Sequence, residues 1–440
     1  MRYPCYPEYK PSGVEWLGDV PAHWGFKRLK FASACINDKQ DALPDGLEYV
    51  AMEHIESWTG KRLETENGVT PESQTNRFRR GDVLFGKLRP YLAKAWLANR
   101  DGVCSTELLV LRERDLEPAY LRYWTLMRSF VEVVDGSTYG SKMPRASWNF
   151  IGNVLTLIPE RDEQRAIAAF LDHETSLIDT LIAKKQRLLE LLAEKRTALI
   201  SQAVTKGLNP DAPMKDSGIE WLGDIPAHWR VSKLAFLSLS LQTGPFGSQL
   251  HSSEYVDDGV PVINPANIQD GSIVPDTKAT VAPEVFARLR RHELQRGDII
   301  FGRRGEMGRC GLVTETEAGW LCGTGSLRVR LDRTIVYPGY MLALLSMRGV
   351  ADYLSLNSVG STMENLNTKI LGSIPVVVPP LSEQSGIARF ASLETDRWRQ
   401  IVERVESAIA VLSEYRSSLI TSAVTGKIDI RDIVQKREMM

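Results

Sequence analysis

The chain has 440 residues, of which 43% are hydrophobic and 25% are charged, and these proportions are typical of a soluble globular protein. A chain of this length is expected to form two or more domains, each with its own buried core. Its formal net charge of -1 argues against non-specific coating of nucleic acid, but it leaves room for a local basic face because the field depends on where charges lie.

The cysteines, the histidines and the N-terminal residues indicate whether the protein has disulfides, a metal site or a membrane segment. The five cysteines include no CxxC pair and the six histidines are scattered, so the sequence predicts reduced thiols and no metal site. The N-terminus has no apolar signal core, and no apolar run approaches the length of a membrane span. We therefore expect a cytoplasmic protein without a membrane segment.

The sequence contains one unit twice. Residues 12–24 read SGVEWLGDVPAHW and residues 217–229 read SGIEWLGDIPAHW, so eleven of thirteen positions are identical and the other two exchange Val for Ile. A long internal repeat decides the architecture, and two copies predict a pseudo-symmetric molecule with two similar halves. Fainter matches follow in the same order: RGDVLFG at 80–86 with RGDIIFG at 296–302, GSKM at 140–143 with GSTM at 360–363, EQ at 163–164 with EQ at 383–384, and AVT at 203–205 with AVT at 423–425.

The first part of each unit is rich in Gly, Pro and β-branched residues. In residues 1–158 short apolar runs lie between turn signals, and the same pattern returns in residues 208–378, where 208–216 form a linker. This pattern is typical of a mixed α/β globule with several short strands. Helices are expected inside the globules around 119–134 and 338–356, where a Pro lies near the start of each.

The second part of each unit predicts a long helix. Residues 160–204 contain no Pro or Gly and are dense in Leu, Ala, Glu, Lys and Arg, which are good helix formers. Residues 381–424 repeat the apolar spacing, and Gly386 is the one exception to this composition. We assign the two spacer helices to 159–207 and 379–426, and a C-terminal tail to 427–440.

These two helices predict the architecture. A helix of about 45 residues is roughly 65 Å long, and one with a single apolar stripe needs a partner in water. The other copy is the obvious partner, and we expect an antiparallel pair. The fold class is therefore α+β, with two pseudo-symmetric mixed α/β globules separated by a pair of long antiparallel coiled-coil helices. The residues expected to pack between the helices are Ile167, Leu171, Ile178, Leu181, Leu188, Leu192, Leu199, Ile387, Trp398, Ile401, Val405, Leu412 and Leu419.

The two globules differ where the repeat is not shared. Residues 25–79 and 230–295 diverge nearly completely, whereas the shared positions are mostly Trp, Gly, Pro and apolar types. One frame with two different loop sets is expected of a reader of two different targets. DNA suits such a reader because its major groove recurs about every 34 Å along one side of the duplex. Two unlike readers imply an asymmetric, split site.

The shared motifs resemble those of a known family. The WLGDxPxHW opening, the RGD[VI][LI]FG strand, the Gly-Ser-x-Met block, the P-x-x-x-EQ helix start and the SLITxAVTG-like helix end are similar to the specificity (S) subunit of type I restriction-modification systems. The resemblance covers nearly the whole chain, in the family's order of variable region, conserved helix, variable region and conserved helix. The combination is highly specific, although RGD or EQ alone carries no information.

The resemblance implies a function and a set of partners. It implies that the globules are target-recognition domains, that each reads one half of a bipartite sequence in double-stranded DNA, and that the paired helices set the gap and dock two methyltransferase (modification) subunits. The resemblance also implies that restriction subunits, which translocate DNA with ATP, join this core. The family's specificity subunit is itself non-catalytic, so no cofactor is expected in this chain. S-adenosylmethionine, ATP and Mg²⁺ are expected on the partner subunits.

Basic residues are the first candidates for contacts with DNA. The richest strip in each globule runs through the RGD strand and the turn after it, where Arg and Lys can contact phosphates or the edge of guanine. The alternative is that these are solvated charges in local ion pairs. The candidates in these strips are Lys87, Arg89, Arg303, Arg304 and Arg309.

Polar loops supply the other candidates. Residues 243–251 (TGPFGSQLH) resemble a loop common in this family's recognition domains, although a plain turn before a strand is equally compatible with them. Residues 140–145 and 360–365 are polar loops before the last strand of each globule. The candidates in and beside these loops are Gln242, Ser248, Gln249, Lys142, Arg145 and, as a spare, Lys369.

The two alternatives to DNA reading are an enzyme and a coiled-coil scaffold that binds proteins. An enzyme is disfavoured because no [DN]PP[FYW] block, Walker motif or methyl-donor loop is found, and INPAN at 263–267 breaks the first of these patterns at Ala266. A coiled-coil scaffold that binds proteins would have no reason to vary its loops on a common frame. Trp16, Trp24, Trp221 and Trp229 are identical between the copies, so we expect them to pack in the frame and not to stack on bases.

Overall fold

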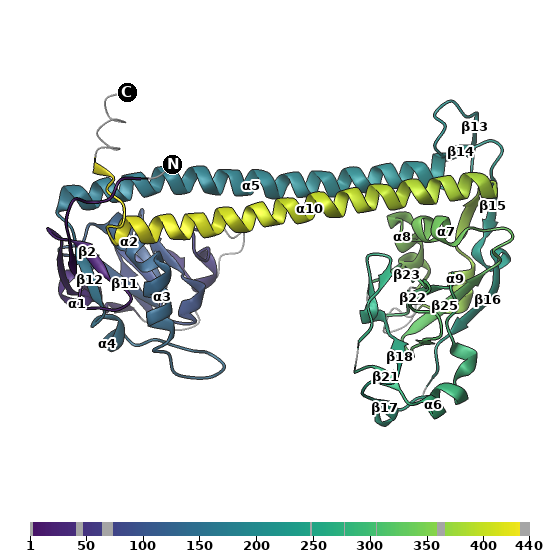
Figure 1. Ribbon diagram of the computed structural model, residues 1–440, viewed down its shortest axis with the longest axis horizontal. Helices are drawn as coiled ribbons and strands as arrows, with labels where there is room; N and C mark the ends of the chain where they lie inside the picture. The colour runs from purple at the N-terminus through teal and green to yellow at the C-terminus, as the bar shows by residue number, and fades with distance from the viewer. Residues whose placement is uncertain are drawn as a thin grey trace. The chain divides into compact units, whose positions relative to one another are not determined.

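The computed structural model describes residues 3–40, 47–63, 74–246, 249–276, 278–304, 306–358 and 366–431 (Figure 1). The chain divides into two compact units. Unit 1 contains Met1–Gln186 and Val405–Met440, and unit 2 contains Arg187–Arg404. Helices α5 (Arg161–Lys206) and α10 (Leu381–Val424) each contribute one stretch to either unit.

The two long helices begin and end where their sequences change. Helix α5 has 46 residues and α10 has 44, and acidic residues in the first turn of each complement the positive end of the helix dipole. The chain leaves α5 through Gly207, with φ of 77°, and leaves α10 through Gly426, with φ of 68°. Both glycines adopt the left-handed conformation that commonly ends helices.

Unit 1 is built on two four-stranded sheets. The first has the order β4-β11-β8-β9 and is antiparallel, and the second has the order β5-β7-β10-β6 with β10 and β6 parallel. Strands β1 and β2, and β12 and β3, form two-stranded pairs. The strands are β1 (Tyr9–Pro11), β2 (Asp19–Pro21), β3 (Gly25–Arg28), β4 (Ser33–Ile36), β5 (Lys39–Gln40), β6 (Glu48–Val50), β7 (Thr75–Phe78), β8 (Val83–Gly86), β9 (Ala95–Leu97), β10 (Gly102–Ser105), β11 (Leu108–Glu113) and β12 (Leu155–Ile158).

Unit 2 repeats this plan. Its first sheet has the order β16-β25-β22-β23 and its second the order β17-β21-β18-β24, with β18 and β24 parallel. The pairs β13–β14 and β15–β26 match β1–β2 and β3–β12 of unit 1. The strands are β13 (Met214–Asp216), β14 (Asp224–Pro226), β15 (Arg230–Lys233), β16 (Ser238–Thr243), β17 (Tyr255–Val256), β18 (Val260–Ile263), β19 (Ile268–Gln269), β20 (Ser272–Ile273), β21 (Thr280–Val281), β22 (Ile299–Gly302), β23 (Cys310–Leu312), β24 (Leu321–Cys322), β25 (Ser326–Leu331) and β26 (Pro375–Val378).

Short helices complete both globules. In unit 1, α2 begins at a proline, and the side chain of Glu117 before it accepts hydrogen bonds from two backbone N–H groups of its first turn. The short helices of unit 1 are α1 (Leu29–Ala32), α2 (Pro118–Leu126), α3 (Arg128–Asp135), α4 (Trp148–Ile151), η1 (Met52–His54) and η2 (Pro90–Leu92). Those of unit 2 are α6 (Pro283–Arg288), α7 (Pro338–Leu345), α8 (Arg348–Asn357), α9 (Thr368–Gly372), η3 (Leu234–Leu237), η5 (Ser252–Glu254), η6 (Pro265–Asn267) and η7 (Arg290–His292).

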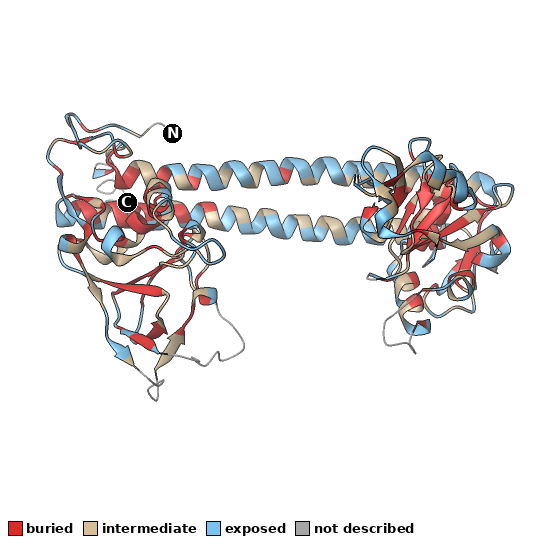
Figure 2. Ribbon diagram, turned by 90° about the horizontal axis from the view of Figure 1, so that it is seen from below, coloured by how far each residue is buried: buried red, intermediate tan, exposed pale blue. Residues whose placement is uncertain are grey.

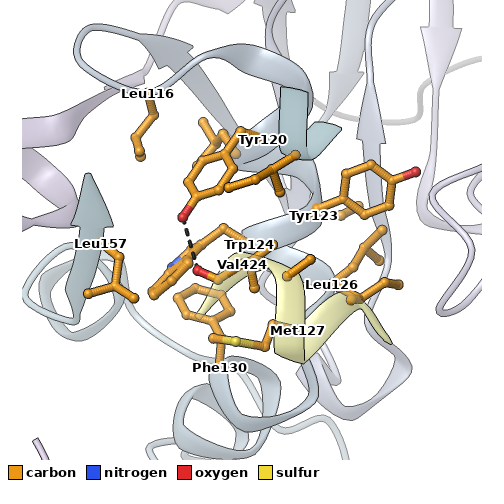
Figure 3. Packing of buried hydrophobic residues seen from close by; sticks show 14 of the residues in the cluster. Leu116, Tyr120, Tyr123, Trp124, Leu126, Met127, Phe130, Leu157 and Val424 are labelled. Carbon is orange, nitrogen blue, oxygen red and sulfur yellow. Dashed lines mark hydrogen bonds between the residues drawn. The ribbon is translucent and has the colours of Figure 1, made fainter. Parts of the chain in front are cut away.

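Each globule packs on the end of the helix that belongs to the other copy of the repeat. In unit 1, Tyr120 donates its hydroxyl hydrogen bond to the carbonyl oxygen of Val424 at 3.1 Å, inside a cluster with Trp124 and Phe130 (Figure 3). In unit 2, Tyr340 makes the same bond to Val204 at 3.2 Å. The mixed globules, their pseudo-symmetry and the long helices were all expected, and the fold class is confirmed.

The helices pair antiparallel within each unit. In unit 1, Asp179 on α5 binds Arg416 on α10. Trp24 contacts the start of one helix and the end of the other, because it donates to Glu163 on α5 and lies close to Gly426 just after α10. In unit 2, Arg196 stacks on the ring of Trp398 at 4.2 Å from its centroid.

The interface between the helices follows a heptad pattern. On each helix a row of covered positions alternates in steps of four and three, which is the 3.5-residue period of a left-handed coiled coil. On α5 they are Leu171, Thr175, Ile178, Ile182, Lys185, Leu189, Leu192, Arg196, Leu199 and Ala203, and on α10 Ala391, Thr395, Trp398, Val402, Val405, Ile409, Leu412, Arg416, Leu419 and Ala423.

Three predicted packing residues differ from this pattern. Leu181 and Leu188 are each 44% exposed and Ile401 is 39% exposed, whereas their neighbours Ile182, Leu189 and Val402 are half-buried. A helix with one partner helix covers only one face, so consecutive leucines cannot both be buried. Figure 2 shows the buried stretches of α5 and α10 at the ends that a globule covers, with exposed and half-buried residues between them. The other predicted packing residues are buried or half-buried.

Candidate nucleic-acid interface

The basic turn of unit 1 lies against a second loop. Strand β8 ends at Gly86, and Arg89 follows in a left-handed conformation with φ of 50°. The N–H of Arg89 donates to the carbonyl of Pro144 at 2.7 Å, and Ala146 donates to the carbonyl of Lys87 at 2.9 Å. The tertiary structure therefore joins the 87–89 turn to the 139–146 loop, although about fifty residues separate them in the sequence.

The charges in this loop pair are partly neutralised. Arg145 binds both carboxylate oxygens of Glu107 at 3.1 Å through Nε, so it is held in a local ion pair as one of the alternatives expected. Lys142 and Arg89 are exposed and Lys87 is half-buried. Among the described residues of unit 1, none of these three side chains forms an ion pair. They are the cations of this surface that remain available to a phosphate.

The equivalent turn of unit 2 follows β22. Arg303 is half-buried, donates from Nε to the carbonyl of Leu366 at 3.1 Å, and lies 4.7 Å from the ring centroid of Phe246. Burial, and secondarily the neighbouring charge of Arg304, lower the pKa of Arg303. Arg304 is exposed and has no ion pair within the described part of the chain. Arg309 is paired with Glu306 at 2.9 Å.

The remaining candidates of unit 2 differ in exposure and in whether their side chains are already hydrogen-bonded. Gln242 on β16 already uses its side chain inside the sheet, since its Oε1 accepts from Arg328 at 2.6 Å. Gln249 is half-buried, and its Oε1 accepts from the backbone of Phe246 at 3.4 Å. Lys369 is exposed on α9. Ser248 lies outside the described residues, as does the 360–365 loop.

The RGD motif proves to be structural in both units. Asp82 accepts a forked pair of hydrogen bonds from Arg112 at 2.8 and 2.7 Å, and Asp298 accepts the same pair from Arg330 at 2.9 and 2.8 Å. Each aspartate is 2% exposed and also accepts from the backbone N–H three residues before it. Such a fork fixes the turn before the central strand, and a repeated arginine in β11 and β25 was the signal that could have predicted it.

The helix-start motif is structural in the same way. Glu163 accepts from the indole N–H of Trp24 at 3.0 Å and lies 3.1 Å from Nε2 of His23. In unit 2, Glu383 accepts from Trp229 at 3.0 Å and lies 2.8 Å from Nε2 of His228. Both tryptophans are fully buried, so they pack in the frame as expected and are not available for base stacking.

Sequence reasoning missed one pair of surface residues. Phe31 on α1 and Phe236 on η3 occupy equivalent positions of the repeat, and they are 58% and 76% exposed. A large aromatic side chain that is exposed in both copies marks a surface that binds another molecule more often than a scattered apolar residue does. The alignment of KFAS with AFLS at 30–33 and 235–238 was the available signal.

Within the ranges described above, no group of three or more His, Cys, Asp or Glu side chains is arranged to hold a metal ion. In those ranges no helix has the length and apolar character needed to cross a membrane.

Comparisons with known proteins add to this geometry. Residues 246–393 match the family model described as the type I restriction modification DNA specificity domain. The matched stretch runs from β17 to β26 and into the start of α10, and it includes Gln249, Arg303, Arg304, Arg309 and Lys369.

Curated proteins extend the likeness beyond that stretch. The chain is 21% identical over 407 residues to the type I restriction enzyme EcoBI specificity subunit of Escherichia coli, covering 90% of this chain and 82% of the relative. It is 23% identical over 231 residues to the EcoDI specificity subunit of the same species, and there it spans about half the relative's length, 47%.

A solved structure on complex assembly and conformational transition of the type I R-M system matches 93% of this chain and 99% of its own, with a TM-score of 0.68 and 20% identity, which supports the fold. The resemblance to type I specificity subunits is thereby confirmed.

Proposed function

We propose that this chain is the DNA-reading specificity subunit of a type I restriction-modification complex, and that each globule reads one half of an asymmetric bipartite site in double-stranded DNA. The single observation that carries the proposal is the pair of equivalent basic turns after β8 and β22. Lys87 and Arg89 in unit 1, and Arg304 in unit 2, form no ion pair with any residue that the structure describes, and they lie at matched places of the frame.

The chemistry of these turns fits a nucleic acid. Phosphate contacts by Lys and Arg supply most of the affinity for DNA, whereas loops that differ between the readers supply specificity. The frame residues Asp82, Asp298, Glu163 and Glu383 are engaged in internal bonds in both units. Differences in target are therefore assigned to the divergent stretches 25–79 and 230–295.

The paired helices are proposed to set the gap between half-sites. Helix α5 is continuous from the globule of unit 1 to that of unit 2, and continuous helices with a heptad interface are stiff connectors. The heptad positions on α5 have counterparts on α10, so a change in helix length can be made in register on both.

The outer faces of the helices are proposed to dock two methyltransferase subunits. Exposed apolar residues occur in equivalent pairs, Leu181 with Ile401 and Leu191 with Val411, and their exposures are 44% with 39% and 46% with 62%. Phe31 and Phe236 form a third pair. A pseudo-symmetric chain that repeats an apolar surface suits two copies of one partner.

Chemistry is assigned to the partners in this proposal. We expect S-adenosylmethionine on the methyltransferase subunits and ATP with Mg²⁺ on restriction subunits that join them, with this chain non-catalytic. The purified chain should therefore methylate no DNA when given S-adenosylmethionine alone.

Methylome sequencing of a host with and without the gene tests the proposal. We expect one asymmetric bipartite motif with a fixed gap to lose its methylation when the gene is deleted. A methylome that does not change, in a host where the partner subunits are expressed, would refute DNA reading and leave the protein-binding scaffold as the surviving function.

A further inference from the structure

The two units differ at the start of their long helices. In unit 1, Tyr6 is 3% exposed and fills the space beside Glu163. Its hydroxyl donates to Oε1 of Glu163 at 2.7 Å, and its ring centroid lies 5.5 Å from that of His23 and 5.7 Å from that of Trp24. The Glu163 side chain is consequently only 7% exposed.

Unit 2 has the same carboxylate without the tyrosine. Glu383 keeps the bonds to His228 and Trp229, but its side chain is 40% exposed. Among the described residues no hydroxyl group donates to it. A cavity of about 330 Å³ opens beside it, lined in part by Leu208, Pro226, His228, Glu383, Gly386 and Ile387.

Chain connectivity explains the cavity. In unit 1 two segments of the chain meet beside Glu163. One is the N-terminal segment with Tyr6, and the other is the segment after α10 with Arg431. The Arg431 guanidinium lies 4.9 Å from the centroid of the Tyr6 ring. In unit 2 one linker, residues 207–213, takes the place of both. The bonds from Ala22 to Glu8 and from Ala227 to Pro213 align the segments, so Tyr6 corresponds to Asp211, which is exposed.

We infer that this cavity of unit 2 binds a tyrosine side chain presented by a partner polypeptide, with the phenol donating to Glu383 and the ring against His228. The apolar wall of Leu208, Pro226 and Ile387 removes the ring from water as the core of unit 1 does for Tyr6. This inference does not depend on DNA reading.

The chemistry of the cavity selects a phenol. An O–H to carboxylate hydrogen bond is charge-assisted and stronger than a neutral one. Phenylalanine would leave Glu383 without the donor, and a phosphorylated tyrosine would bring a second negative charge beside it. An aliphatic residue would lack both the hydroxyl and the aromatic contact that Tyr6 makes with His23.

Binding of capped tripeptides to the full chain tests the inference. The probes are N-acetylated, C-amidated Ala-Tyr-Ala and Ala-Phe-Ala, with dissociation constants measured by ligand-observed NMR. We expect saturable binding of the tyrosine peptide in about the millimolar range, as for a single buried side chain, and binding of the phenylalanine peptide weaker by about ten-fold. Equal affinity of the two peptides, or no saturable binding, would overturn the inference.

Two variants locate the binding. Gly386→Leu should fill the cavity and weaken the tyrosine peptide at least ten-fold, because a Cβ there meets only Leu208, at 3.8 Å, and the backbone need not move. Ser385→Leu places the same leucine side chain at the neighbouring exposed position and should leave binding unchanged. Undiminished binding to Gly386→Leu, or equal loss in Ser385→Leu, would contradict the assignment. The methylome result is independent of both.

Discussion

Arg416 on α10 donates from Nε to Oδ1 of Asp179 on α5 at 2.8 Å, with side chains 8% and 11% exposed. The same guanidinium donates to the carbonyl oxygens of Trp58 and Thr59. One arginine therefore joins both long helices to the globule of unit 1. Since a charge is buried only at a cost unless it is fully partnered, the group fixes how these three elements meet.

Replacing Arg416 with Ala should destabilise unit 1 by about 3 kcal/mol. Among the described residues Asp179 would keep Lys61 alone as an ionic partner, and two carbonyls would lose donors. Urea unfolding followed by circular dichroism measures this. Arg187→Ala is a control at an exposed ion pair on α5, since the Arg187 side chain is 59% exposed and paired with Glu190, and it should leave stability nearly unchanged. Similar losses in the two variants would contradict the structural role.

Neighbouring positions on α5 test the heptad interface. Ile182→Ala should cost about 1–2 kcal/mol because the half-buried Ile182 packs against unit 1's core, whereas Leu181→Ala should cost little because Leu181 is 44% exposed. Thermal unfolding of the two variants side by side measures the difference. A larger loss of stability in Leu181→Ala than in Ile182→Ala would show that the apolar stripe predicted from the sequence, which includes Leu181, forms the interface.

His292 gives unit 2 a pH-dependent stability. Burial first, then the charge of Arg291, lowers the pKa of His292 to about 4. An unfolded histidine titrates near 6.5, so the unfolded state binds more protons between these values. The stabilising contribution of the neutral ring is complete above about pH 6.5 and is lost as pH falls toward 4.

His292→Asn should flatten that dependence. Urea unfolding at pH 7 and pH 5 measures it, and the wild-type chain should lose more stability than the variant over this interval. An equal change in the free energy of unfolding between pH 7 and pH 5 in the wild type and in His292→Asn would show that His292 is not the source of the pH dependence.

The basic turns should contribute to DNA affinity through phosphates. Arg304→Ala, alone or with Arg303→Ala, and Lys87→Ala should each weaken DNA binding by the assembled complex by up to about ten-fold at fixed salt, and each lost contact should reduce the salt slope by about one. Assembly should be intact. Arg348→Ala, at a 91% exposed side chain on α8, is the control. Unchanged affinity for the Arg304 and Lys87 variants at the same salt would exclude these turns from the interface.

Helix length should set the gap between half-sites. Insertion of one heptad into α5 and one into α10 preserves the interface, because the covered positions repeat every seven residues. Seven residues add about 10 Å of helix, or roughly three base pairs at 3.4 Å each. The methylome of a host with this variant should show the same half-sites with a longer gap. Methylation of the original spacing alone would refute the ruler role.

The sequence did not predict which of the candidate cations are already paired within the chain. The sequence correctly pointed to the turns after the RGD strand as basic and to the tryptophans as frame residues. It could not separate Arg304, which is exposed, from Arg309 and Arg145, which are paired with Glu306 and Glu107. The partner of Arg145 is distant in the chain, so only the packing of the two loops revealed that its charge is already neutralised.

By itself the sequence determined the repeat, the two mixed globules, the long helices and their family likeness, because composition and periodicity are local properties of the chain. Tertiary structure alone decided that Ile182 and not Leu181 faces the partner helix, that Gln242 is engaged with Arg328 inside a sheet, and that a cavity replaces Tyr6 in the second unit. Each of these depends on which surface a neighbouring element covers, and that is set by packing between segments far apart in the chain.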